Sequence, residues 1–245
     1  MIKGKVLLLG KEKSFIIDLD QKKFSCQYGF VDLTKIKKYG QKIKCGSEEL
    51  VALKPMLIDL LRKCKRGPQI IMPKDAAQII ATTGATNGWK CLDAGGGSGF
   101  LSMFLANIVG PDGSVVTYEK ERRNFDVIKY NVKYCGLEGM IKVKNADALK
   151  FSERSLDLIT LDMKDVVKMV PKAYAVLNPG GWVAIYSPHI EQQRAVVERM
   201  RKQGFVQIKT LENIQREWKI GEGGFTHPKP SGIMHTGFLS FGRKA

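Results

Sequence analysis

Four glycines fall within five positions in the segment Asp93-Ala94-Gly95-Gly96-Gly97-Ser98-Gly99. Glycines let a backbone turn sharply and approach a ligand closely. A dinucleotide-binding loop requires the pattern G-x-G-x-x-G, but phenylalanine or serine occupies the third place from either possible start. A different spacing, with an acidic residue followed by glycines at every second position, is met by Asp93, Gly95, Gly97 and Gly99. A plain strand-to-helix turn needs only one glycine, so this loop is predicted to bind a ligand.

This spacing resembles the loop that holds S-adenosylmethionine (SAM) in Rossmann-like methyltransferases, whose acidic residue faces the ammonium end of the cofactor. We therefore expect all seven residues of the loop to bind SAM: Asp93, Ala94, Gly95, Gly96, Gly97, Ser98 and Gly99. Glu119 ends the second expected strand, where a carboxylate can accept hydrogen bonds from both ribose hydroxyls. Asp147, next to Ala148, follows the third strand and is expected near the adenine amino group. Taken alone, Glu119 could be a solvated charge at a strand end and Asp147 could be a turn residue. Asp93, Glu119 and Asp147 each come at the end of a successive strand, and this order favours a cofactor site.

Asp162 is the candidate catalytic residue. It ends the fourth expected strand, at the carboxyl edge where open α/β sheets bind their substrates. The motifs of the N6-adenine and N4-cytosine enzymes, the 5-methylcytosine enzymes and the metal-dependent catechol enzymes are absent. When N1 of adenine attacks a methyl group, the ring gains positive charge that the exocyclic amine shares. A carboxylate beside that amine would stabilise the charge and accept a proton. The other interpretation of Asp162 is a helix N-cap.

Several segments of residues 68–245 match, in the same order, segments of one known enzyme family. Besides the glycine loop they are Gln69-Ile70-Ile71-Met72-Pro73-Lys74-Asp75, Leu161-Asp162-Met163, Tyr186-Ser187-Pro188-His189, Arg216-Glu217-Trp218 and His235-Thr236-Gly237-Phe238-Leu239. Together they resemble the tRNA (adenine-N1)-methyltransferases that modify the T-loop adenine. The glycine loop is common to methyltransferases in general, whereas the two C-terminal segments, 216–218 and 235–239, are specific to this family. The resemblance implies SAM as methyl donor, tRNA as substrate, a homotetramer and catalysis by Asp162, and it leaves open whether one adenine or two neighbouring adenines are modified. It also implies a substrate side formed by Met72, Asp75, Tyr186, His189, Arg216, Trp218 and His235.

Two positions depart from that family. Met72 stands where tyrosine is usual, and Met163-Lys164-Asp165 follows Asp162 where a Pro-Trp pair is usual. Both departures lie on the substrate side. Three alternatives therefore stay open: a different RNA base as target, a protein carboxylate or corrin-type metabolite as substrate, and a weakly active RNA-binding paralogue.

Strands that alternate with helices predict a parallel α/β sheet in residues 68–245. Strands are expected at 90–93, 115–119, 141–145, 156–162 and 182–186, and helices at 73–83, 100–109, 122–135, 166–177 and 190–203. The strands 206–211 and 234–241 have no helix between them, which predicts a terminal antiparallel pair. The expected fold class is a Rossmann-like, SAM-dependent methyltransferase domain preceded by a small β-rich domain, residues 1–67.

The N-terminal domain is expected to contain strands at 5–9, 14–18 and 23–28, a helix at 48–64 and a linker at 66–68. Positive charge is concentrated in this domain. The first 68 residues hold 16 of the 40 basic and 7 of the 24 acidic residues, in a chain of net charge +16. Such an excess favours a polyanionic partner, and tRNA fits it.

Membrane and metal functions are disfavoured by the sequence. No apolar run approaches the roughly 20 residues of a spanning helix, and the apolar stretch near the N-terminus is shorter than the about 7–15 residues of a signal peptide. The five cysteines lack a C-x-x-C pair and the three histidines lack ligand spacing, so neither a metal site nor a disulfide framework is expected. We expect a cytoplasmic protein.

Overall fold

The computed structural model describes residues 4–67, 70–221, 223–230 and 234–245. It divides into two compact units, Met1–Cys64 and Lys65–Ala245, and each is described by itself. Pro68, in the expected linker, and Gln69, at the start of the family-like segment, lie outside the described residues. In the part of the chain that is described, no helix is both long and apolar enough to cross a membrane.

The first unit is built on a small antiparallel sheet with the strand order β2-β1-β6-β5. Its strands are β1 (Lys5–Leu9), β2 (Ser14–Asp18), β5 (Lys42–Cys45) and β6 (Glu48–Leu53), and a separate hairpin joins β3 (Lys23–Cys26) to β4 (Gly29–Asp32). A short 3-10 turn, Leu33–Lys35, follows β4. Alternate residues of the strands, such as Val6, Leu8, Leu50 and Ala52, form its buried core. The β-rich character and the first three strands were predicted.

The predicted helix over residues 48–64 is wrong. The segment forms β6, which pairs with β1 and β5, and then the short helix α1 (Leu57–Leu61). Leu50 and Ala52 are fully buried while their neighbours are not, which is the period of a strand. Pro55 separates the two elements, because proline disfavours helical backbone at the residue before it. The leucines at helical spacing on both sides of Pro55 misled the prediction.

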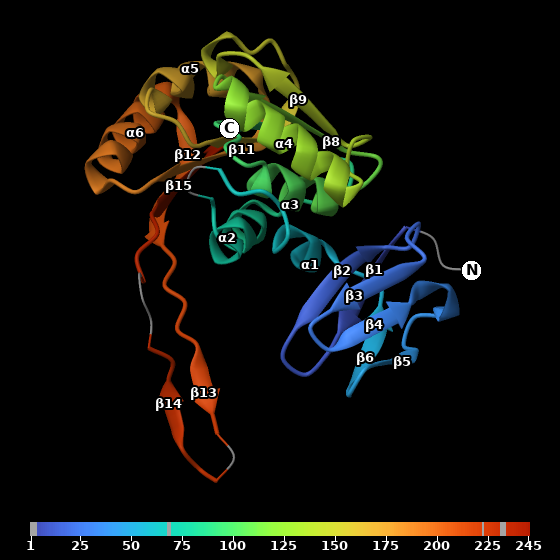
Figure 1. Cartoon of the computed structure of the whole chain (residues 1–245). Helices are drawn as coiled ribbons and strands as arrows, with labels where there is room; N and C mark the ends of the chain where they lie inside the picture. The colour runs from blue at the N-terminus through green and yellow to red at the C-terminus, as the bar shows by residue number, and fades with distance from the viewer. Residues whose placement is uncertain (1–3, 68–69, 222, 231–233) are drawn as a thin grey trace. The chain divides into compact units, whose positions relative to one another are not determined.

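The second unit contains a seven-stranded sheet with the order β12-β15-β11-β10-β7-β8-β9 (Figure 1). The parallel strands are β7 (Lys90–Ala94), β8 (Ser114–Glu119), β9 (Ile141–Asn145), β10 (Leu156–Leu161) and β11 (Leu177–Ser187). The final strands, β12 (Phe205–Glu212) and β15 (Phe238–Lys244), pair antiparallel with each other, and β15 also pairs antiparallel with β11. The predicted parallel sheet with an antiparallel end is confirmed.

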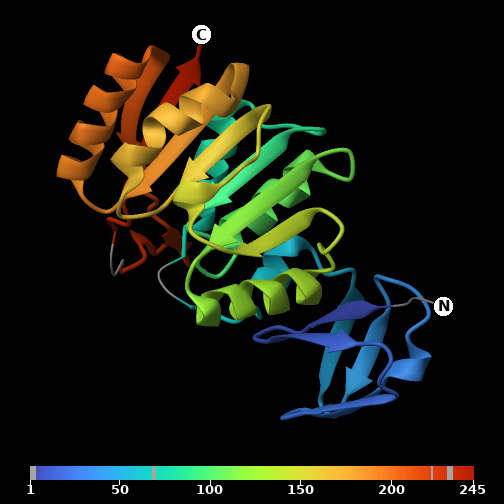
Figure 2. The same ribbon diagram turned by 90° about the horizontal axis from the view of Figure 1, so that it is seen from above.

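Helices lie on both faces of this sheet, as Figure 2 shows from above. They are α2 (Pro73–Thr83), α3 (Phe100–Val109), α4 (Arg122–Cys135), α5 (Val166–Val176) and α6 (Ile190–Gln203). α3 and α4 pack on β7, β8 and β9, whereas α5 and α6 pack on the half that contains β11. Right-handed crossovers in opposite directions from the centre give this arrangement. The local signals are clear: Pro73 opens α2, and Gly84 ends it in the left-handed conformation with φ 74°.

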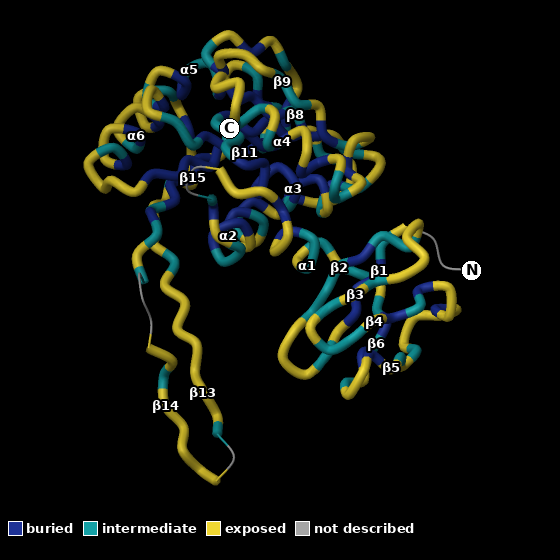
Figure 3. Tube along the Cα trace, in the orientation of Figure 1, coloured by how far each residue is buried: buried dark blue, intermediate teal, exposed yellow. Residues whose placement is uncertain are grey.

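A two-stranded arm interrupts the chain between β12 and β15. It consists of β13 (Trp218–Ile220) and β14 (Thr226–Pro228), which pair only with each other in the described sheets. Figure 3 shows the arm as mostly exposed. Ile220 and Phe225 are 83% and 85% exposed, which is rare for large apolar side chains. The sequence did not predict these strands, because short strands without a buried face lack an alternating pattern.

Candidate functional site

A cavity of about 590 Å³ opens at the carboxyl ends of the parallel strands. The strand order reverses between β7 and β10, and such a switch point is where open α/β sheets bind ligands. The cavity collects residues predicted from five separate segments of the sequence. They are Asp93, Gly95, Gly96, Gly97, Ser98, Glu119, Asp147, Ala148, Asp162 and Tyr186. The other two loop residues, Ala94 and Gly99, adjoin it as the end of β7 and the N-cap of α3.

The glycine loop is shaped by close backbone contacts. The amide groups of Gly95 and Gly96 both donate to the carbonyl oxygen of Tyr118, at 3.1 and 3.0 Å. Gly95 has a φ of +89°, and a Cβ atom there would lie 2.0 Å from the carbonyl oxygen of Asp162. Only glycine fits that place. The loop and the Asp162 segment are therefore in direct contact.

Asp93 connects the start of the glycine loop to α3 and β10 through its carboxylate. It is buried, and its two carboxylate oxygens accept hydrogen bonds from the hydroxyls of Ser102, at 2.5 Å, and Thr160, at 2.7 Å. Burial raises the pKa of Asp93, the two hydrogen bonds oppose that rise, and the charge of Glu119 adds to it. Asp93 thus combines a structural contact with β10 and α3 with a place on the cavity wall. Neither hydroxyl partner was predicted: Thr160 lies 67 positions away, and Ser102 lies in the adjoining helix α3 with no pattern that marks it.

Glu119 and Asp147 each use part of their carboxylates within the protein. Glu119 accepts hydrogen bonds from the backbone amides of Gly97 and Glu121, both at 2.9 Å. Asp147 accepts one from the amide of Leu149 at 2.9 Å and caps a 3-10 turn at 148–150. The turn and the cavity contact occur together at Asp147, so the two interpretations of that residue are compatible.

Asp162 lies just beyond β10 and faces the cavity. Its backbone amide donates to the carbonyl oxygen of Ala94 at 2.9 Å, whereas no described residue makes a hydrogen bond to its carboxylate. Burial raises the pKa of Asp162 to about 7, and the negative charges of Asp93 and Glu119 add to the rise. The N-cap of α5 is Asp165, so the helix-cap interpretation of Asp162 is wrong.

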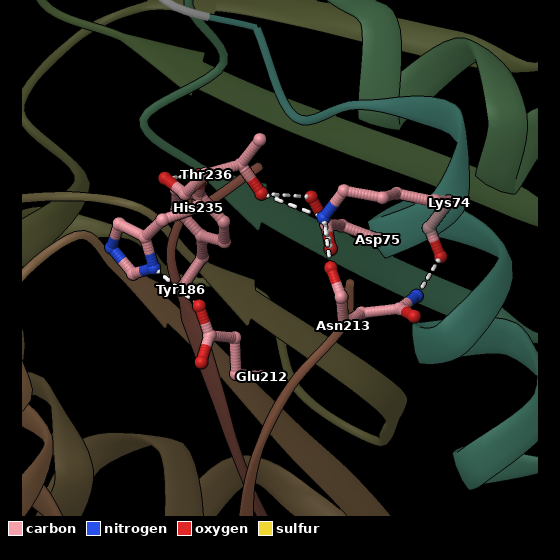
Figure 4. A network of polar contacts seen from close by, with 7 residues as sticks. All are labelled: Lys74, Asp75, Tyr186, Glu212, Asn213, His235 and Thr236. Carbon is pink, nitrogen blue, oxygen red and sulfur yellow. Dashed lines mark hydrogen bonds and ion pairs between the residues drawn. The ribbon is translucent and has the colours of Figure 1, made fainter. Parts of the chain in front are cut away.

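Tyr186 connects the cavity to a buried polar network (Figure 4). Its hydroxyl donates to the carbonyl oxygen of Thr236, and burial raises its pKa to about 12. The Thr236 hydroxyl contacts Asp75 at 2.9 Å, and the Lys74 ammonium forms an ion pair with Asp75 at 2.8 Å. Asp75 is fully buried, does not line the cavity, and joins α2 to the start of the last strand.

The remaining predicted substrate-side residues do not line the cavity either. His235 contacts Glu212 at 2.6 Å, which raises the pKa of that imidazole, and Pro188 at 3.4 Å. Met72 and His189 are the exposed N-caps of α2 and α6. Arg216 precedes the arm, and Trp218 begins its first strand with 56% of its surface exposed.

Two lysines on the cavity wall and a pair of polar side chains behind it were not predicted as site residues. Lys120 and Lys164 line the cavity and bring positive charge to its wall. Gln192 of α6 contacts the segment that follows Asp162, and the buried Ser187 contacts Gln192. The sequence did contain a signal for the last pair, since both belong to the segment at the exit of the fifth strand.

The described residues fit a cationic, nucleoside-containing cofactor. Glycines at 95, 96 and 97 leave backbone open to the cavity, and three carboxylates, from Asp93, Glu119 and Asp162, give it a negative field. No group of three or more His, Cys, Asp or Glu side chains in the described part of the chain is arranged to hold a metal ion.

Comparison with known proteins gives consistent matches. Residues 60–229 match the family model described as the tRNA methyltransferase complex GCD14 subunit. The chain is 31% identical to tRNA (adenine(57)-N(1)/adenine(58)-N(1))-methyltransferase TrmI of Methanocaldococcus jannaschii, over 99% of this chain and 95% of that protein. Among solved structures, a SAM-dependent O-methyltransferase from Thermotoga maritima superposes with a TM-score of 0.85 at 28% identity, covering 98% and 92% of the two chains. The tRNA (m1A58) methyltransferase TrmI of Aquifex aeolicus superposes with a TM-score of 0.80 at 24% identity, covering 100% and 98%.

Proposed function

The chain belongs to the tRNA methyltransferase family of the GCD14 subunit, and we propose that it transfers the methyl group of SAM to N1 of a T-loop adenine in tRNA. The relative from M. jannaschii is named for adenines 57 and 58, and we propose the same pair of positions here. The observation that carries the proposal is the place of Asp162. Its side chain lines the cavity, its carboxylate accepts no hydrogen bond from any described residue, and its backbone carbonyl oxygen lies against Gly95 of the glycine loop.

We assign the cofactor to the glycine-loop side of the cavity. SAM supplies an electrophilic methyl group on a sulfonium. Because residues 95–97 carry no side chains, their backbone would let the cofactor approach closely. Asp93 and Asp162 would face its positive charges, and Glu119 retains lone pairs for ribose hydroxyls beyond its two backbone hydrogen bonds. Asp147 and Ala148 line the adenine side. The shared cavity supports this assignment for eight of the ten predicted cofactor residues, and the other two, Ala94 and Gly99, adjoin it.

Asp162 is the proposed catalytic residue. Adenine N1 carries a lone pair in the plane of the ring, so no base is needed to create the nucleophile. As the ring gains positive charge, the Asp162 carboxylate accepts a hydrogen bond from the exocyclic amine and can take its proton. This role requires the ionised form. A cation bound near Asp162 favours that form and lowers its pKa from the value of about 7.

We propose that the first unit is a separate RNA-binding domain. N1 lies on the pairing edge of adenine, so the base must leave its stack to reach the cavity. That step requires contacts with the surrounding phosphates. The unit is strongly basic, and its exposed lysines include Lys11, Lys13, Lys22, Lys23, Lys35, Lys37 and Lys38. Lys164, on the cavity wall, is suited to a phosphate next to the target base.

We further propose that the arm packs in a homo-oligomer, with the tetramer implied by the family resemblance. Trp218 and Ile220 lie on β13 and Phe225 lies directly before β14, and each of the three side chains is more than half exposed. Exposed apolar groups of that size mark association surfaces in soluble proteins.

Methyl mapping tests the proposed function. The protein is incubated with methyl-labelled SAM and unmodified tRNA transcripts, and the product is digested to nucleosides. We expect N1-methyladenosine from the T-loop, and loss of the product when the T-loop adenines are replaced. A methyl group on a ribose hydroxyl, on another base or on the protein itself would assign a different acceptor, and no transfer at all would favour the inactive paralogue.

A further inference from the structure

Gln192 has no part in the chemistry proposed above, yet it touches the segment that carries the candidate catalytic residue. It lies in the first turn of α6, directly after the exit of β11. Its side-chain amide nitrogen donates to the carbonyl oxygen of Lys164 at 3.0 Å and makes a longer contact of 3.4 Å with that of Met163. These two carbonyl groups belong to the residues that follow Asp162.

A second side chain fixes the orientation of the amide. The Ser187 hydroxyl donates to the Oε1 atom of Gln192 at 2.5 Å, and Ser187 Oγ accepts from the backbone amide of His189 at 3.0 Å. Ser187 is almost fully buried. Carbonyl oxygens only accept hydrogen bonds, so the amide nitrogen of Gln192 must face the loop and its oxygen must face Ser187.

Asp162 depends on its backbone for its direction. On one side its amide is bound to Ala94 and its carbonyl oxygen lies against Gly95. Its carboxylate has no hydrogen-bond partner among the described residues that would hold the side chain itself. On the other side the chain crosses the exposed residues Lys164 and Asp165 before α5 begins. The contacts from Gln192 hold this second side.

We propose that Gln192 is a positioning residue for methyl transfer, which fixes the loop at 162–165 so that the Asp162 carboxylate faces the target base. The proposal rests on the proposed function of the site. Ser187 acts through Gln192 by holding its amide in the donating orientation. Neither residue lines the cavity, so neither is expected to touch the cofactor or the base.

The kinetic test uses Gln192→Met, which keeps the length of the side chain and removes its donors. Gln203→Ala is the matched control, a glutamine on the same helix whose side chain makes no hydrogen bond with the described residues. Single-turnover rates are measured at saturating SAM and tRNA, together with both dissociation constants. We expect a loss of about 10- to 100-fold in rate for Gln192→Met, with affinities unchanged, because a displaced catalytic group affects the reaction and not binding.

Ser187→Ala extends the test. We expect a smaller loss of rate, and we expect the double variant to be no slower than Gln192→Met, since the two side chains act in series. Fully additive losses, or a rate for Gln192→Met within about twofold of the wild type, would overturn the positioning role. A wild-type protein that methylates no tRNA would instead overturn the proposed function.

A titration separates the two proposals without substrate. The Asp162 carboxyl is followed by ¹³C NMR in the protein without SAM and assigned with Asp162→Asn. The groups that face it, Asp93, Glu119 and Tyr186, are the same in all variants. In Gln192→Met the freed loop admits water, so the pKa of Asp162 should fall from about 7 toward its ordinary range. An identical titration in the wild type and in Gln192→Met would reject the positioning role even if the enzyme were inactive.

Discussion

Replacing Asp162 with asparagine should slow methyl transfer and at the same time stabilise the cofactor-free protein. Asparagine keeps the shape of the side chain and removes its negative charge. Loss of one well-placed electrostatic contact lowers the rate by about 10²–10³. Binding of tRNA should change little, because Asp162 lies in the cavity wall and contributes no phosphate contact.

The gain in stability follows from the raised pKa. Its rise from 3.8 to about 7 would correspond to about 4 kcal/mol at 1.36 kcal/mol per unit. Because the side chain is partly solvated, solvent screening reduces this to about 1–2 kcal/mol. The folded protein binds this proton more tightly than the unfolded chain does. The penalty is therefore absent below the unfolded pKa, grows as the pH rises toward 7 and stays constant above it.

Thermal unfolding at pH 8 measures the effect. A difference of about 1–2 kcal/mol should raise the Tm of Asp162→Asn by roughly 3–6 °C in a domain of this size. The difference should vanish near pH 4. Asp165→Asn is the control, since its pKa is lowered by Lys168 and its replacement should bring no gain. A single-turnover rate within about threefold of the wild type, or a lower Tm at pH 8, would refute the assignment.

Three further predictions concern the cofactor, the RNA and the arm. Gly97→Val places a branched side chain at a φ of +57°, where, apart from the adjoining residues, the nearest described atom to the Cβ position is the Gly95 carbonyl oxygen at 3.9 Å. The added side chain should therefore occupy the cavity and abolish SAM binding in calorimetry while the fold persists; unchanged affinity would move SAM elsewhere. Affinity for tRNA should fall steeply with salt, and fall less steeply when Lys11, Lys22, Lys23 and Lys38 are changed to glutamine; a flat salt dependence would argue against phosphate contacts. Ile220→Ser with Phe225→Ser should reduce the mass in light scattering without lowering the Tm, and an unchanged mass would exclude the arm from the interface.

The local parts of the fold and site were predictable from the sequence. The glycine loop, the helices that begin at Phe100 and Arg122, and the strand-end positions of Glu119 and Asp162 each depend on residues within one strand-turn-helix unit. Their signals therefore lie close together in the sequence. The helix-cap alternative for Asp162 needed the structure, because two aspartates precede α5 and only one of them stands at its N-cap.

Features that depend on distant partners were not predictable. Asp75 is adjacent to Lys74, but its environment is set by Thr236, 161 positions away. Gln192 acts on a loop 28 positions earlier. The segment at 48–54 carried both helical and strand periodicity, and pairing with β1 and β5 decided between them. The arm has no buried face to leave a pattern.

The position of β15 determines the order in which the sheet can be completed. β15 lies between β11 and β12, although β12 is synthesised first. Until residues 238–244 emerge, β11 is an open sheet edge and β12 has no neighbour with which to pair. The Lys74–Asp75 ion pair lacks its hydrogen bonds with Thr236 until that residue emerges, so the early half of the unit folds with these polar groups incompletely bonded. Such late, long-range pairing slows folding and exposes an edge that other chains can bind. Chaperone dependence during synthesis, and sensitivity to small C-terminal truncations, are the expected biological costs of this topology.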